Sequence, residues 1–288
     1  MLGMSELTLR DPKLAWSAVS ELPLARQRRV QGLSYTIGGN DLRIADHVAA
    51  FTFSDTILLF TKGDEAEDLR SILFACLEML TLLLSRSVPV RIGVAHGLFV
   101  FNLDEGLLVG PPLIQAYRLG EAAQWLGVVL DQPVAERAAQ LDPPLEDGKG
   151  LDLVVRWNVP QKSGGTVSQA VLAWPRSHRG NFRVEPPISV GQFYQAFEQL
   201  FGPLSGLRSM DRAKYENTVA FVNAMLGSEG CANVSGRRPS ALRQIAKRIY
   251  AIYRGRMTVF RLSPFLLFYQ ETNAVKLLCE FGLRNPGL

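Results

Sequence analysis

A single carboxylate inside an apolar stretch is the first residue that could do chemistry. In FTFSDTILLF, residues 51–60, Asp55 separates two runs of residues that are typical of buried strands. Two interpretations are open. Asp55 marks the polar tip of a hairpin, where aspartate is common, or it is a metal ligand held at the end of a strand, because Mg²⁺ binds carboxylate oxygens in proteins.

Two cationic side chains could contact phosphate. Arg118 follows PPLIQAY on an expected helix; an exposed helix arginine is the default interpretation, although a guanidinium can also neutralise phosphate charge. Lys162 lies in the loop sequence PQKSGGT, where a phosphate contact is again the alternative to simple exposure. His96 stands in an apolar run and is expected to be a buried structural histidine rather than a catalytic one.

The composition excludes several classes of protein. The chain has 288 residues, 47% of them apolar, which suffices for one large domain or a domain with a helical extension. No apolar run reaches the roughly 18 residues of a membrane span, and the first residues lack the basic and apolar regions of a secretory signal. The three histidines and three cysteines have no zinc-ligand spacing, and such separated cysteines suit a reducing cytosol, so we expect a cytoplasmic protein.

The elements that must position these residues alternate between strand and helix. Near-continuous apolar strands between helices predict an α/β fold in which helices cover a sheet. The strands expected from apolar and β-branched runs are a hairpin at 48–61 with Asp55 at its turn, one long strand at 88–102, a short strand at 126–131, and a pair at 151–159 and 167–174. The helices expected among them lie at 69–84, from Pro111-Pro112 onward, and at 133–141.

The composition changes after residue 175, which predicts a boundary. We expect a first domain at 1–175, a linker at 176–189 and a helical C-terminal region at 190–288. Helices in that region are expected at 190–201, 211–226 and 240–254. Residues 236–288 carry ten Lys or Arg against two Glu. The last helix is basic and amphipathic; by default it packs on its own domain, and contact with an anionic membrane or an acidic partner is the alternative.

The order of these motifs resembles the class III nucleotidyl cyclase homology domain, in its bacterial branch. In that family a hairpin with an aspartate at its tip precedes a helix, an R-I-G-I-H-x-G strand and a G-x-x-V-N-x-A-A-R-L-E helix. Here the strand is RIGVAHG at 91–97 and the later helix is GPPLIQAYRL at 110–119. The likeness covers residues 1–175 and implies a ferredoxin-like α+β sandwich that forms a homodimer, with each site shared between two subunits.

The resemblance implies that Asp55 holds Mg²⁺ or Mn²⁺. The second metal ligand of the family comes from a first strand, and its aspartate would fall just before Met1. A sheet that lacks this strand would have an unpaired edge. Arg118 matches the family's transition-state arginine, and Lys162 is a candidate contact for the nucleotide.

Three further positions depart from the family pattern. Ile114 stands where the family has a transition-state asparagine, and it cannot donate a hydrogen bond. Phe51 and Leu107 stand where the family has a lysine and a polar partner that bind the purine base. The resemblance therefore does not specify which nucleotide base is bound.

The resemblance thus implies conversion of a nucleoside triphosphate to a cyclic nucleotide and pyrophosphate by two-metal catalysis. With one metal ligand missing, we expect this activity to be weak or absent. The alternative is a catalytically degenerate module of the same fold that senses a nucleotide or serves dimerisation. A third interpretation gives the function to the basic tail.

Overall fold

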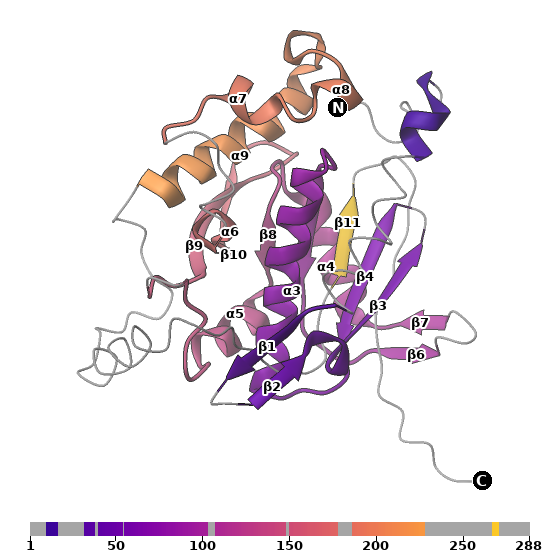
Figure 1. The fold of residues 1–288 in the computed structure, drawn as a ribbon, viewed down its shortest axis with the longest axis vertical. Helices are drawn as coiled ribbons and strands as arrows, with labels where there is room; N and C mark the ends of the chain where they lie inside the picture. Colours follow the sequence, from indigo (N-terminus) through magenta and orange to yellow (C-terminus); the bar gives the residue numbers. More distant parts are fainter. Residues whose placement is uncertain are drawn as a thin grey trace.

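The computed structural model describes residues 10–16, 32–37, 40–53, 55–102, 107–147, 150–177, 186–227 and 267–270. Its architecture is α+β, with one five-stranded sheet and three two-stranded ones in the described part (Figure 1). The strands are β1 Ser34–Ile37, β2 Asn40–Arg43, β3 Val48–Phe53, β4 Thr56–Thr61, β5 Val90–Val94, β6 Val100–Asn102, β7 Leu107–Val109, β8 Val128–Leu130, β9 Val154–Pro160, β10 Thr166–Leu172 and β11 Leu267–Gln270. The helices are α3 Ala66–Ser85, α4 Pro111–Ala122, α5 Gln132–Ala139, α6 Trp174–Ser177, α7 Val190–Tyr194, α8 Glu198–Phe201 and α9 Ser209–Gly227, with short 3₁₀ turns at Ile44–Asp46 and Leu204–Gly206.

The predicted hairpin at 48–61 is confirmed as β3 and β4, which pair antiparallel from Val48↔Thr61 to Phe53↔Thr56. Successive side chains of a strand point to opposite faces. In β4, Ile57 and Leu59 therefore join the main hydrophobic cluster, whereas Leu58 and Phe60 join a second cluster on the other face. The hairpin is buried on both sides, which explains its continuous apolar sequence.

The helix α3 covers the first of these faces, and α4 covers the second. α3 begins with a capping box in which Glu65 and Asp68 satisfy each other's backbone N–H groups, and most of its surface is buried. α4 begins with two prolines, whose missing N–H groups would have no partner in the first turn of a helix. The result is a sheet between two helical layers.

β5 approaches α4 closely because residue 93 is glycine. A Cβ atom on Gly93 would lie 1.9 Å from the backbone oxygen of Ala116, inside α4. A glycine within a strand often marks such a close backbone approach. The contact fixes the position of α4 over the sheet.

The predicted single strand at 88–102 is wrong. β5 ends at Val94, and the chain is irregular from Ala95 to Phe99 before β6 begins at Val100. The break directs β6 into a separate hairpin with β7. A Cβ atom on Gly97 would lie 3.2 Å from Pro112, so this irregular segment lies against the start of α4.

The five-stranded sheet has the order β11-β5-β8-β10-β9. β5 and β8 are parallel, and the other neighbours are antiparallel. The pair β9 and β10 confirms the strands predicted around the Lys162 loop. β11 pairs with β5 and also contacts β4, so a strand from the far end of the chain lies along the edge of β5 (Figure 1).

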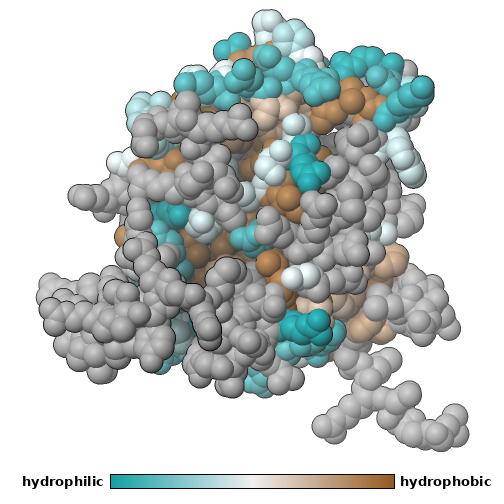
Figure 2. Space-filling view, in the orientation of Figure 1, coloured by the Kyte–Doolittle hydropathy of each residue, from teal (hydrophilic) through white to brown (hydrophobic). Residues whose placement is uncertain are grey.

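The described part of the C-terminal region packs on the rest of the chain through α9. Phe221 makes edge-to-face contacts with Trp125 and Trp157, at centroid distances of 4.6 and 5.2 Å. The helix predicted at 211–226 is confirmed, but that at 190–201 is interrupted and forms the two short helices α7 and α8. Polar side chains gather along the upper rim of the face in Figure 2, over these helices.

The region predicted to be helical also contains a strand, β11. The basic helix predicted at 240–254 lies outside the described residues. Within the part of the chain that is described, no helix has the length and apolar character needed to cross a bilayer.

Candidate functional site

Asp55 lies at the turn of the β3–β4 hairpin, between the paired residues Phe53 and Thr56. Its position at the tip of the hairpin was predicted. The tip is not solvated, however, since the Asp55 side chain is buried and the residue is only 4% exposed. A carboxylate is normally kept in water unless a partner or an ion compensates the burial. Burial therefore distinguishes Asp55 from an ordinary turn aspartate.

A hollow of about 420 Å³ lies beside the first turns of α4. This is the size of many small-ligand sites. Its lining comes from one face of α4 and from the segment after β5, and consists of His96, Pro111, Pro112, Ile114, Gln115 and Arg118. The α4 residues recur at helical spacing, whereas Leu113 and Ala116 point the other way, into the second hydrophobic cluster.

Arg118 and Ile114 thus share one hollow, four residues apart on the same helix. The Arg118 side chain is exposed, and within the described residues it has no ion-pair or hydrogen-bond partner. Ile114 is 44% exposed, which is unusual for isoleucine, and gives the hollow an apolar wall. The hollow therefore offers one available cation beside an apolar surface.

The other predicted nucleotide contacts do not line this hollow. Phe51 is half-buried and packs against the second hydrophobic cluster. Leu107 begins β7, and its side chain lies outside the described residues. Asp55 is not part of the lining either.

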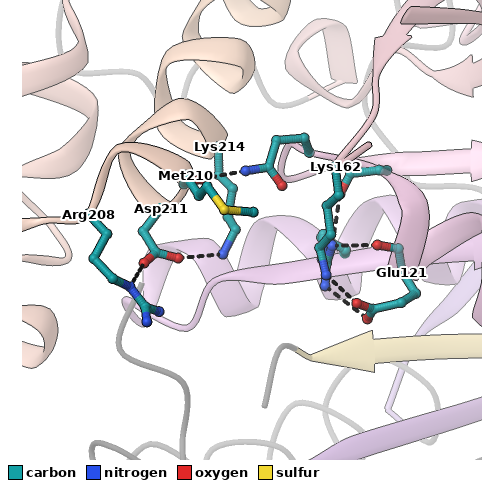
Figure 3. Close-up of polar contacts among 9 residues, drawn as sticks. Glu121, Lys162, Arg208, Met210, Asp211 and Lys214 are labelled. Atoms are coloured by element: carbon teal, nitrogen blue, oxygen red, sulfur yellow. Dashed lines mark hydrogen bonds and ion pairs between the residues drawn. The ribbon is translucent and has the colours of Figure 1, made fainter. Parts of the chain in front are cut away.

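Lys162 is engaged in an ion-pair network at the last turn of α4 (Figure 3). Its ammonium group contacts the Glu121 carboxylate, whose other oxygen lies 3.2 Å from the Arg91 guanidinium. Arg91 also donates to the backbone oxygens of Glu121 and Ala123 and is only 1% exposed. The arrangement ties β5, α4 and the β9–β10 turn together, which gives Arg91 a structural role.

A second polar cluster in Figure 3 lies at the start of α9. The Asp211 carboxylate accepts from Arg208 at 2.7 Å and from Lys214 at 3.1 Å, and Lys214 is 3% exposed. Gln124 donates to the backbone oxygen of Met210 beside it. The Gln124 contact joins α9 to the segment before β8, whereas the Asp211 contacts are local to the start of α9.

His96 was expected to be a buried structural histidine, but it is partly exposed and lines the hollow. Its Nε2 atom is 3.0 Å from Nη1 of Arg137. Its backbone N–H donates to Asp131, the residue that follows β8 and also accepts from Val134 to cap α5. Because β5 and β8 are parallel neighbours, the residues after them meet at one sheet edge, where ligands commonly bind in α/β sheets.

Two pKa values in this region depart from their usual ranges. Burial, with the positive charge of Arg137, lowers the pKa of His96, although Asp64 opposes this shift. Burial raises the pKa of the Asp131 carboxyl, against the effect of the backbone N–H groups of Val134 and His96. Both groups titrate in an environment that disfavours their charged forms.

Among the residues that the structure describes, no group of three or more His, Cys, Asp or Glu side chains is arranged to hold a metal ion. The predicted metal position holds the single Asp55 carboxylate, which is buried and already interacts with another group of the protein. Mg²⁺ is commonly held by one or two carboxylates together with substrate phosphates. One carboxylate matches that chemistry in kind, and metal binding at Asp55 stays a prediction.

Comparison with known proteins identified no relative. No family model matches the chain, and no curated protein and no solved structure is significantly similar to it.

Proposed function

We propose that this protein is a class III nucleotidyl cyclase-like protein that binds the phosphates of a nucleoside triphosphate beside α4. The observation that carries the proposal is the exposed guanidinium of Arg118 in a ligand-sized hollow, with no partner among the described residues. The order of elements supports it: a hairpin with Asp55 at its turn, α3, the RIGVAHG segment, a second hairpin and α4 follow in the order of that family.

In the proposed reaction, the ribose 3′-hydroxyl attacks the α-phosphorus, the bond to the β-phosphate oxygen breaks, and pyrophosphate leaves. Arg118 would neutralise phosphate charge that grows in the transition state. Because Asp55 does not line the hollow of Arg118, we propose that Asp55 of one subunit serves the hollow of the other in a homodimer. A Mg²⁺ or Mn²⁺ ion held there would supply further charge neutralisation and acidify the hydroxyl. We propose that turnover is slow, because Ile114 cannot donate the hydrogen bond expected at its position.

A non-catalytic nucleotide-binding module is the second candidate, and the apolar wall formed by Ile114 favours it. Such a module would retain the phosphate contact of Arg118 without the geometry for attack. Homodimerisation remains part of both proposals, since the related sites are built from two subunits.

Calorimetry with ATP, GTP, CTP and UTP, each with Mn²⁺, tests the phosphate site. We expect micromolar to millimolar binding of at least one triphosphate and a loss of about tenfold or more in Arg118→Gln, because one charge-assisted phosphate contact contributes about 1.5–3 kcal/mol. Arg156→Gln, an exposed arginine on β9, is the matched control and should bind normally. No binding of any triphosphate, or equal binding by Arg118→Gln, would contradict the proposal.

A product assay separates the two candidates. Formation of a cyclic nucleotide that is lost in Asp55→Asn supports the enzyme, whereas binding without turnover supports the non-catalytic module. Activity that survives Asp55→Asn would remove the metal role of this residue.

A further inference from the structure

His96 belongs to the hollow and to a charged cluster at the same time. The cluster joins three elements: Asp64 precedes α3, His96 follows β5, and Arg137 lies on α5. The Arg137 guanidinium is 2.8 Å from the Asp64 carboxylate and 3.0 Å from Nε2 of His96, and that nitrogen is 3.5 Å from Asp64. The imidazole thus stands between a cation, an anion and the hollow.

The contact with Arg137 determines the protonation state of the imidazole. A guanidinium keeps its charge and can only donate hydrogen bonds. Nε2 of His96 must therefore accept, which requires a neutral ring with its proton on Nδ1. This state agrees with the lowered pKa of His96.

Protonation would break this contact and rearrange the cluster. A proton on Nε2 removes the lone pair that Arg137 uses, and the Asp64 carboxylate, 3.5 Å away, is an acceptor for the new N–H group. The imidazolium would also add a positive charge to a hollow that Arg118 already lines. A neutral hollow wall would thus become a cationic one.

We propose that His96 is a second anion contact of this hollow and makes its affinity for phosphate groups depend on pH. The inference rests on the proposed function, because it assumes that the ligand of the hollow carries phosphate. A bound phosphate stabilises the imidazolium, and by linkage protonation strengthens phosphate binding.

The other charged groups around His96 do not titrate in the same way. Arg137 and Arg118 stay cationic at all relevant pH values. Asp64 faces Nε2, and Asp131 accepts the backbone N–H of His96. Burial raises the pKa of the Asp131 carboxyl, so protonation of Asp131 also contributes to the pH dependence of binding. A variant of His96 separates the contribution of His96 from that of Asp131.

The sign of the effect follows from the direction of the His96 shift. Burial lowers the pKa of His96 in the free protein, and a bound phosphate would raise it by stabilising the imidazolium. Affinity therefore rises as pH falls from the bound-state pKa to the free-state pKa. In that window the association constant increases up to tenfold per pH unit, the limit for uptake of one proton.

Titration of the full chain with inorganic tripolyphosphate between pH 5 and 8 tests the proposal. The ligand itself titrates, so wild-type protein and His96→Asn are compared at each pH, where the ligand contributes equally. The asparagine amide can still accept from Arg137 but carries no charge. We expect the ratio of wild-type to variant affinity to grow by about tenfold or more from pH 8 to pH 5, and the His96 ring resonance to show a pKa that rises on ligand addition.

The two proposals fail in different ways. Absence of tripolyphosphate binding at every pH, or binding that Arg118→Gln leaves unchanged, would overturn the proposed function. Binding that depends on Arg118 but has the same pH profile in wild type and His96→Asn would overturn only the role of His96. A circular dichroism spectrum that is unchanged in His96→Asn excludes misfolding as the cause.

Discussion

At the scale of single residues, Gly93 allows β5 to lie directly against α4. A methyl group there would overlap the backbone oxygen of Ala116, and neither β5 nor α4 can move without disturbing the core. We expect Gly93→Ala to lower the free energy of unfolding by about 3 kcal/mol, at the upper end for overpacking. Urea denaturation followed by circular dichroism measures the loss.

Gly191 in α7 is the matched control for this substitution. A Cβ atom there meets nothing within 4 Å, and alanine is the better helix former. Gly191→Ala should leave stability unchanged or raise it slightly. Equal denaturation midpoints for the two variants would mean that α4 does not lie against β5 as described.

At the scale of elements, a buried hydroxyl is one of the contacts between α9 and the segment before β8. Thr218 Oγ1 accepts from the N–H of Leu126 at 2.8 Å and donates to the backbone oxygen of Lys214 at 2.6 Å. Thr218→Val keeps the shape but leaves the Leu126 N–H without its acceptor. We expect a loss of about 1–3 kcal/mol in the free energy of unfolding.

Thr218→Ser separates the hydrogen bond from the packing. It retains the hydroxyl and removes a methyl group, so its cost should be the smaller of the two. Thermal denaturation under the same conditions measures which of the two variants is less stable. A serine variant less stable than the valine variant would show that the methyl group of Thr218 matters more for the packing of α9 than its hydroxyl.

At the scale of the whole molecule, the sheet depends on a strand from the far end of the chain. β11 pairs with β5 from Leu267↔Gly93 to Gln270↔Val90. A chain that ends at residue 266 should expose that edge of β5, exchange the β5 amide hydrogens faster and associate more readily, because an open edge pairs with other chains. Hydrogen exchange by mass spectrometry and sedimentation measure these effects.

A chain that ends after Glu271 is the control, because it removes the following residues and retains the strand. It should protect the β5 amides as the full chain does. Equal exchange in the two truncated chains would contradict the pairing of β11 with β5.

Much of the local structure could be predicted because it depends on neighbouring residues. The apolar run of α3, the paired prolines that open α4 and the turn at Asp55 each follow from propensity and periodicity within a few positions. The break after Val94 could not be predicted in the same way. Residues typical of strands fill the whole run from 88 to 102. The strand is nevertheless interrupted where Gly97 lies against Pro112, a residue outside that run.

For the candidate site, the residue types could be read from the sequence: an aspartate in a hairpin turn, an arginine on α4 and a histidine after β5. Which of them meet could not, because contact between distant residues depends on how the elements pack in three dimensions. The packing brought Arg118, Ile114 and His96 to one hollow, engaged Lys162 with Glu121, and buried Asp55. Parallel pairing of β5 with β8 placed His96 beside Asp131, and the packing of α5 brought Arg137 to the imidazole, so the charge of His96 is a property of the fold.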